Sequence, residues 1–264
     1  MKISAVMPVF NTRAIYLREA IQSVFDQTCP VCELIIIDDG STRPETLEAL
    51  YHIVYHTGLS FHPKIRFVSQ KNKYISGALN TGIRLMDGDW WAGCPSDDRW
   101  LPSKIEKQVK FIKAYPEAKV IYSDWQFISH LGEVLEDYQE FSFKDRISAG
   151  KHIIREYIGA WGGMMIHRSV FDDIGLFNEA FPTREDYEFV VRILTKYMMY
   201  HIPKVLFQYR LHDEQTSTST NLGTRSDDSR KYCEMARDLA IEHFGNEEDR
   251  KAFPLGREYR WGKQ

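Results

Sequence analysis

The segment Leu34–Ile37 places aliphatic residues next to one another with no polar residue between them. A strand with one face in water alternates polar and apolar side chains, whereas a strand covered on both faces reads as a continuous apolar run. The run ends abruptly at Asp38-Asp39-Gly40-Ser41, a sequence typical of a turn. This segment therefore predicts a central strand of a sheet that has helices packed on both faces.

Strand-like and helix-like patterns alternate along the first half of the chain. Between the strand-like segments, apolar residues recur at helical spacing, as they do from Tyr16 to Phe25. The segments predicted to be strands are Ile3–Val9, Leu34–Ile37, Ile65–Val68, Trp90–Cys94 and Val120–Tyr122. This alternation is typical of an α/β protein with a largely parallel, Rossmann-like central sheet flanked by helices.

The second half of the chain alternates less regularly. Helices are predicted at Arg168–Ile174, at Asp186–Leu194 and, near the C-terminal end, over Cys233–Phe244. Two segments, Met198–Ile202 and Val205–Tyr209, are predicted to form a hairpin or paired strands. Because the sequence shows no internal repeat and no linker rich in Pro, Gly and Ser, we expect one continuous domain with a C-terminal helical extension.

The charge balance and the apolar pattern exclude several classes of partner. The chain has 34 Lys and Arg against 37 Asp and Glu, so it carries no excess of cations to neutralise a nucleic acid. No apolar stretch approaches the ~20 residues of a membrane-spanning helix, and the apolar run at the N-terminus is too short for a signal peptide. We therefore expect a soluble, cytoplasmic protein with no nucleic-acid partner.

Cys29 and Cys32 have the Cys-x-x-Cys spacing found in redox motifs and in zinc sites. A redox pair normally opens a helix, whereas this pair precedes a strongly apolar strand. A zinc site needs four ligands, and Cys94 and Cys233 are single and distant in the sequence. We interpret the pair as two thiols in a helix-to-strand connection.

Polar residues follow four of the predicted strands at the point where each strand ends. These residues are Asn11, Asp38-Asp39, Lys71-Asn72 and Ser96-Asp97-Asp98. In parallel α/β sheets, ligands bind beyond the carboxyl ends of the strands. We therefore expect these side chains to converge on one crevice.

Several short motifs occur in a fixed order: Val6–Asn11, Glu33–Ser41, Ser96–Pro102, Glu185-Asp186 followed by Arg192, and Tyr209–His212. In that order they resemble family 2 glycosyltransferases, which have the GT-A fold. The resemblance covers roughly residues 1–215. It implies inverting transfer of a sugar from a nucleotide-sugar donor, most often a UDP-sugar, to a carbohydrate or glycoconjugate acceptor. It also implies a nucleotide-sugar-binding half (1–100) and a catalytic and acceptor half (101–215).

The resemblance implies that Asp38 and Pro8 contact the base of the nucleotide, with Asp39 as the neighbour. A carboxylate after a buried strand can accept hydrogen bonds from a uracil ring or a ribose hydroxyl, although Asp-Gly and Ser also favour a plain turn. The other candidate nucleotide-binding residues are Phe10, Asn11, Lys71, Asn72, Gly77, Asn80 and Ser96. Helix packing is the alternative for Gly77, and plain exposure is the alternative for Lys71.

Ser96-Asp97-Asp98 is the candidate metal site. A sugar nucleotide carries a diphosphate, and Mn²⁺ or Mg²⁺ bridging its oxygens needs only one or two protein carboxylates. The family pattern is Asp-x-Asp-Asp, but its first position here is Pro95, so Asp97 is the best candidate ligand, with Asp98 and His212 as further ones. The alternatives are an acidic helix start for the aspartates and a solvated side chain for His212.

Glu185-Asp186 is the candidate catalytic pair. Inverting transfer needs a base that takes the proton of the acceptor hydroxyl, and the resemblance assigns this role to Asp186, with Glu185 beside it. Acidic residues at a helix N-terminus are also favoured by the helix dipole alone. Trp161, Gly162 and Gly163 stand where relatives place acceptor-contacting residues, since an aromatic face can lie against a sugar ring. A core position is the alternative for Trp161.

Two other functions fit parts of the pattern. A nucleotidyltransferase shares the fold class, but its glycine-rich basic loop is replaced here by Pro8–Arg13. A non-catalytic sugar-nucleotide-binding module is suggested by Pro95.

Residues 216–264 form the predicted C-terminal region. We expect a mobile loop at Thr216–Thr220, either a lid or a plain loop, followed by the C-terminal helix and by a basic, aromatic tail over 250–264. The tail is expected to dock on the domain, with weak membrane-surface association as the alternative.

Overall fold

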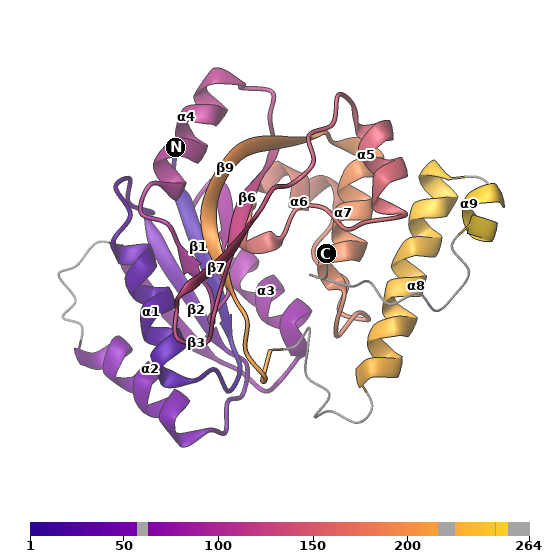
Figure 1. Ribbon diagram of the computed structural model, residues 1–264. Helices are drawn as coiled ribbons and strands as arrows, with labels where there is room; N and C mark the ends of the chain where they lie inside the picture. Colours follow the sequence, from indigo (N-terminus) through magenta and orange to yellow (C-terminus); the bar gives the residue numbers. More distant parts are fainter. Residues whose placement is uncertain (57–62, 216–224, 246, 253–264) are drawn as a thin grey trace.

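The computed structural model describes residues 1–56, 63–215, 225–245 and 247–252. These residues form one sheet of nine strands in the order β3-β2-β1-β4-β8-β6-β9-β5, with β7 paired to β6. Helices cover both faces of the sheet (Figure 1). The loop predicted at Thr216–Thr220 and the tail beyond residue 252 lie outside the described residues.

The first four strands of the sheet are all parallel. In sheet order they are β3 (Lys64–Ser69), β2 (Glu33–Asp38), β1 (Ile3–Val9) and β4 (Trp90–Gly93). The helices between them are α1 (Ala14–Phe25), α2 (Pro44–His56) and α3 (Tyr74–Leu85). The alternation predicted for the first half of the chain is therefore confirmed.

The Leu34–Ile37 run is buried on both faces of β2. Ile35 belongs to one core cluster together with Leu79 of α3, and Ile36 belongs to a second cluster together with Leu17 of α1. Because successive side chains of a strand point to opposite faces, both faces of β2 require apolar residues. This explains why the run does not alternate.

Helix α3 approaches β1 closely at Gly82. A Cβ atom on Gly82 would lie 2.3 Å from Cγ1 of Val6, far inside van der Waals contact. We expect Gly82→Ala to lower the free energy of unfolding by about 1–3 kcal/mol, because the helix would have to move away from the strand. Urea unfolding followed by circular dichroism measures the change. Arg84→Ala, on the exposed side of the same helix, is the control, and an equal loss in the two variants would contradict the packing argument.

The second half of the sheet is mixed. β8 (Met165–His167) is antiparallel to both β4 and β6 (Val120–Ile128), and β9 (Met199–Arg210) is parallel to β6. Two short strands, β5 (Arg99–Trp100) and β7 (Val134–Tyr138), are antiparallel to β9 and β6 respectively.

The course of β9 corrects one prediction. The hairpin or paired strands expected over 198–209 are instead one continuous strand. Its register against β6 shifts between Ile202 and Val205, so that Pro203 and Lys204 form an irregularity with exposed side chains. Proline has no N–H group for a strand ladder and is tolerated at such bulges. Pro203 therefore marks a bulge in one strand and not a turn between two.

The remaining described helices are α4 (Lys104–Ala114), α5 (Arg146–Ile153), α6 (Arg168–Ile174), α7 (Glu185–Lys196), α8 (Arg225–Phe244) and α9 (Glu247–Ala252). Helix α8 packs against α5 and α7. The contact with α5 is close, since a Cβ atom on Gly150 would lie 2.4 Å from the Phe244 ring. Within the described ranges, every helix is too short or too polar to cross a bilayer.

Candidate active site

Two adjoining cavities open beyond the carboxyl ends of β1, β2 and β4. The first, which we call the strand-end cavity, is lined by the segments that follow these strands and by residues near 212–215. The second, which we call the aromatic cavity, has walls formed by Trp125, Phe127, Tyr157, Trp161, Phe207 and Tyr209. The two cavities share the lining residues Ile75, Pro95, Asp97, Trp161 and Gln215, so they adjoin each other.

Most of the predicted nucleotide-binding residues line the strand-end cavity. These are Pro8, Phe10, Asn11, Asp39, Asn72 and Ser96. Asp97 and His212, two of the predicted metal ligands, line it as well. The fold thus brings together at one place residues as far apart in the chain as Pro8 and His212.

The two aspartates after β2 face in different directions. The oxygens of buried Asp38 accept hydrogen bonds from the Ser41 N–H (3.0 Å) and the Ser69 hydroxyl (3.0 Å). Asp39 lines the strand-end cavity, and its Oδ1 accepts a hydrogen bond from the Lys73 N–H (2.9 Å). Burial raises the pKa of Asp39. The expectation that Asp38 faces the crevice does not agree with this geometry, because Asp38 closes the turn and Asp39 lies on the cavity wall.

Asn11 shapes the rim of the strand-end cavity. Its backbone has φ of +51°, in the left-handed region that asparagine tolerates better than most residues. Its Oδ1 accepts hydrogen bonds from the N–H groups of Thr42 (2.7 Å) and Arg43 (2.8 Å), which fixes the loop before α2. Next to it, the hydroxyls of Thr12 and Ser96 are 2.7 Å apart and join the ends of β1 and β4.

Three predicted nucleotide-binding residues, Lys71, Gly77 and Asn80, lie away from both cavities in the described structure. Lys71 is exposed, and Gly77 sits inside α3, where a Cβ atom would collide with a neighbouring side chain. The Nδ2 of buried Asn80 donates to Glu179 and to the carbonyl of Phe177, and its Oδ1 accepts the Phe177 N–H, each at 2.9 Å. Asn80 fastens α3 to the segment before α7, so its amide is not available to a nucleotide.

Asp97 lies where the two cavities meet. Its Oδ2 is 3.1 Å from Nε2 of His212, and the two side chains are 31% and 6% exposed. A carboxylate oxygen and an imidazole nitrogen that face each other are donors suited to a divalent cation such as Mn²⁺. The described residues contain no cluster of three or more His, Cys, Asp or Glu side chains around one point. A cation here would therefore take its remaining ligands from a diphosphate and water.

Asp98 and Arg210 hold the Asp97 segment in place, and Asp98 also lines the aromatic cavity. Asp98 is buried, and its Oδ1 accepts the N–H of Arg210 at 2.9 Å. Burial and the charge of Asp97 raise the pKa of Asp98 well above its usual range. The Arg210 guanidinium, also buried, donates to the carbonyl of Asp97 (2.8 Å) and pairs with Glu19. Sequence reasoning gave Arg210 no role, although a charged residue at the end of a largely apolar strand beside His212 was a usable signal.

The acidic pair at the start of α7 lies in the aromatic cavity. Glu185 and Asp186 both line the cavity, the first buried and the second half-buried. Burial raises the pKa of both carboxyl groups. Arg184, at φ +60° just before the helix, and the hydroxyl of Tyr157 both oppose this rise in the pKa of Asp186. A carboxylate with a raised pKa beside an open cavity is suited to accept a proton.

The Trp161–Gly163 turn forms the wall between the cavities. Trp161 lines both cavities and stacks on buried Trp91, with ring centroids 6.3 Å apart, so it is at once a cavity residue and a core residue. A Cβ atom on Gly162 or Gly163 would lie 2.9 Å from the Phe207 ring. The two glycines therefore let the turn rest on β9. Gly162 lines the aromatic cavity, and Gly163 lies behind it.

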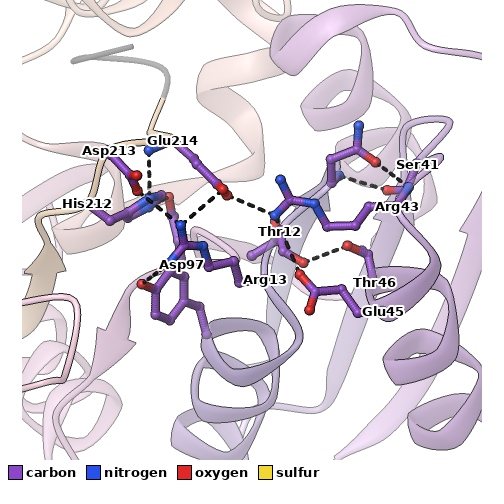
Figure 2. Close-up of polar contacts among 12 residues, drawn as sticks. Thr12, Arg13, Ser41, Arg43, Glu45, Thr46, Asp97, His212, Asp213 and Glu214 are labelled. Carbon is purple, nitrogen blue, oxygen red and sulfur yellow. Dashed lines mark hydrogen bonds and ion pairs between the residues drawn. The ribbon is translucent and has the colours of Figure 1, made fainter. Parts of the chain in front are cut away.

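Residues 211–215, which we call the strap, run from the end of β9 to the N-terminal half of the chain. The Nη2 of Arg13 lies 3.0 Å from Glu214 and 3.1 Å from Asp213. The Nη1 of Arg43 lies 2.8 Å from the other carboxylate oxygen of Glu214. The two arginines lower the pKa of Glu214 to about 2. Figure 2 shows this chain of ion pairs across the rim of the strand-end cavity.

Comparison with protein families gives a match over much of the same region. Residues 4–175 match the family model described as "Glycosyl transferase family 2". The match includes the segments after β1, β2 and β4 that line the strand-end cavity, and it ends before α7.

Two curated relatives match most of this chain over a smaller part of their own length. A Rickettsia felis protein described as an uncharacterized glycosyltransferase is 31% identical over 218 residues, which is 81% of this chain and 35% of that protein. Chondroitin synthase of Escherichia coli is 26% identical over 215 residues, which is 81% of this chain and 30% of that protein. The chain spans about a third of the length of these two relatives.

Solved structures include a match to S. aureus TarS, residues 1–349, in complex with UDP-GlcNAc. The TM-score is 0.67, the sequence identity is 15%, and the match covers 96% of this chain and 73% of the other. At this identity, the similarity shows a shared fold.

Proposed function

The chain belongs to glycosyl transferase family 2 and has the GT-A fold, and we propose that it transfers a sugar from a nucleotide-sugar donor to an acceptor hydroxyl with inversion. The observation that carries the proposal is the junction of the two cavities at Asp97. One cavity offers polar groups at strand ends, and the other offers a carboxylate base among aromatic rings. A sugar at the junction would have its leaving group on one side and its acceptor on the other.

The donor that we propose for the strand-end cavity is a UDP-sugar. Asp39 takes the role expected of Asp38, because Asp39 is the aspartate on the cavity wall and a carboxylate can accept a hydrogen bond from a uracil N–H. Pro8 and half-exposed Phe10 offer apolar surface to the base. The TarS structure holds UDP-GlcNAc, which supports a uridine nucleotide without identifying the sugar.

Asp97 and His212 are the residues that would hold a divalent cation, Mn²⁺ or Mg²⁺. Such a cation would neutralise charge on the departing diphosphate. The protein's part is to keep the two side chains in place. Arg210 does so by donating to the carbonyl of Asp97, and Asp98 does so by accepting the N–H of Arg210.

Asp186 is the general base in this proposal, and the acceptor is a carbohydrate or glycoconjugate. The half-buried carboxylate of Asp186 would take the proton of the acceptor hydroxyl as that oxygen attacks the anomeric carbon. Trp161 offers an aromatic face at the junction on which a sugar ring can rest. In this proposal, residues 1–100 together with His212 form the donor half, and residues 101–215 form the acceptor half.

A panel of sugar nucleotides tests the proposal. We expect UDP-sugars with Mn²⁺, at a hundredfold excess over Kd, to raise Tm by roughly 5–10 °C, because ligand binding stabilises only the folded state. On long incubation without acceptor, the enzyme should release UDP slowly from the bound donor. Binding without any release would indicate a non-catalytic module. Release of pyrophosphate from a nucleoside triphosphate and a sugar phosphate would indicate a nucleotidyltransferase.

A further inference from the structure

Arg13 is the residue from which the further inference starts. Among the described residues that line the strand-end cavity, it is the single Lys or Arg. Its side chain is 35% exposed, and its guanidinium is held by two carboxylates of the strap, at 3.1 Å from Asp213 and 3.0 Å from Glu214. A guanidinium group at the rim of a cavity is suited to bidentate binding of phosphate oxygens.

Glu214 stands between two arginines at the same rim. One of its oxygens pairs with Arg13, and the other pairs with Arg43 at 2.8 Å (Figure 2). Glu214 itself lines the strand-end cavity. The carboxylate of Glu214 is therefore paired with the guanidinium of Arg13 inside the strand-end cavity. A nucleoside diphosphate bound in this cavity would bring its own negative charges to the same guanidinium.

We propose that Glu214 acts as an internal anion that holds Arg13 until a donor is bound, and that the diphosphate of the donor displaces it from Arg13. Arg13 is then a diphosphate-binding residue, and Glu214 is its built-in competitor. The inference rests on the proposed function, since it takes the ligand of the strand-end cavity to be a nucleoside diphosphate.

The geometry allows this exchange at low cost. When Arg13 turns to the diphosphate, Glu214 keeps its second partner, Arg43, so its carboxylate is not left without a cation. Both arginine side chains are about one-third exposed, at 35% and 31%, and ion pairs at such positions are weak. A diphosphate carries more charge than a carboxylate and offers more acceptor oxygens to one guanidinium.

Calorimetric titration of uridine, UMP and UDP into the whole chain tests the inference, with Mn²⁺ and with EDTA in separate series. Arg13→Gln should weaken UDP binding by about tenfold or more and leave uridine binding within about twofold, because only UDP carries the diphosphate. Glu214→Gln should tighten UDP binding by about threefold to tenfold at low salt, and the gain should shrink as salt is added.

Glu45→Gln is the matched control. It removes the same charge from the other acidic neighbour of Arg43, at 3.6 Å, outside the cavity lining, and should leave UDP binding unchanged. Weaker UDP binding in Glu214→Gln would overturn the inference, because Glu214 would then support the site and not compete with the ligand. Equal losses for uridine and UDP in Arg13→Gln would also overturn it. If the unaltered chain binds neither UDP nor a sugar nucleotide, the proposed function itself fails.

Discussion

Replacing Asp186 with asparagine is expected to lower kcat by roughly 10²–10⁴-fold, the usual contribution of a general base. Asparagine keeps the shape of the side chain and its Oδ1, which accepts the Tyr187 N–H at 2.8 Å, so the first turn of α7 should stay intact. It cannot accept a proton from an acceptor hydroxyl. Donor binding should therefore remain within about twofold while transfer is lost. Initial rates with saturating donor, and donor titration of the same variant, separate the two quantities.

The pH dependence provides a second measurement on the same residue. Burial raises the pKa of Asp186 above the usual aspartate value of about 3.9, so kcat/KM should fall with decreasing pH at a higher pH than an exposed aspartate would give. The sign follows from the role, because protonation removes the base. The Asp186→Asn variant should lack this acid limb.

Glu185→Gln is the control for both measurements. Burial and the charge of Asp186 raise the pKa of Glu185 well above its usual range. Replacing Glu185 with a neutral amide should therefore lower kcat by about tenfold or less. If Glu185→Gln abolished transfer while Asp186→Asn retained it, the two carboxyl groups would have to exchange roles.

The first half of the fold could be predicted because the residue pattern of each segment reflects which of its faces are buried. The Leu34–Ile37 run lies between two helical layers, and its lack of alternation reports burial on both faces. The order of the strands then brings Asn11, Asp39 and Asp97 to one edge of the sheet without any knowledge of their contacts.

Parts of the second half could not be predicted because they depend on partners far away in the chain. β5 and β8 have two and three residues, too few for a period of two to be visible. Each is a strand only because its neighbours in the sheet, β9 for β5 and both β4 and β6 for β8, supply its hydrogen bonds. The bulge at Pro203 and Lys204 could not be predicted either, because it is created by the pairing of β9 with β6.

In the candidate site, the sequence could predict the types of residue but not the orientation of their side chains. Sequence order could place a pair of aspartates at a strand end, but it could not say which of them lines the strand-end cavity. Ser69, on the neighbouring strand β3, donates a hydrogen bond to Asp38 and so holds the Asp38 side chain away from the cavity wall. Asn80 is likewise fixed by Phe177, a residue 97 positions away. Such contacts exist only in the folded chain.

Substitutions in the second pair of adjacent aspartates, Asp97 and Asp98, are expected to differ strongly in their effect on the transfer rate. Asp97→Asn should lower transfer by roughly 10²–10³-fold and raise the Mn²⁺ concentration needed for half-maximal rate, because the cavity loses the charged oxygen that faces His212. Asp98→Asn should stay within about threefold of the original rate. Its side chain is buried, and the amide Oδ1 of asparagine can still accept the N–H of Arg210.

The contrast between these neighbours is the test, since the two substitutions make the same chemical change, from carboxyl to amide, one position apart. Transfer rates at several Mn²⁺ concentrations, with thermal unfolding to confirm that both variants are folded, give the comparison. Equal losses would mean that the two aspartates act together on the cation and that the burial of Asp98 does not separate their roles. A larger loss in Asp98→Asn, with an unchanged Mn²⁺ requirement in Asp97→Asn, would move the metal ligand to Asp98. The observed geometry favours Asp97, because it is the aspartate that lines both cavities and has an imidazole nitrogen 3.1 Å away.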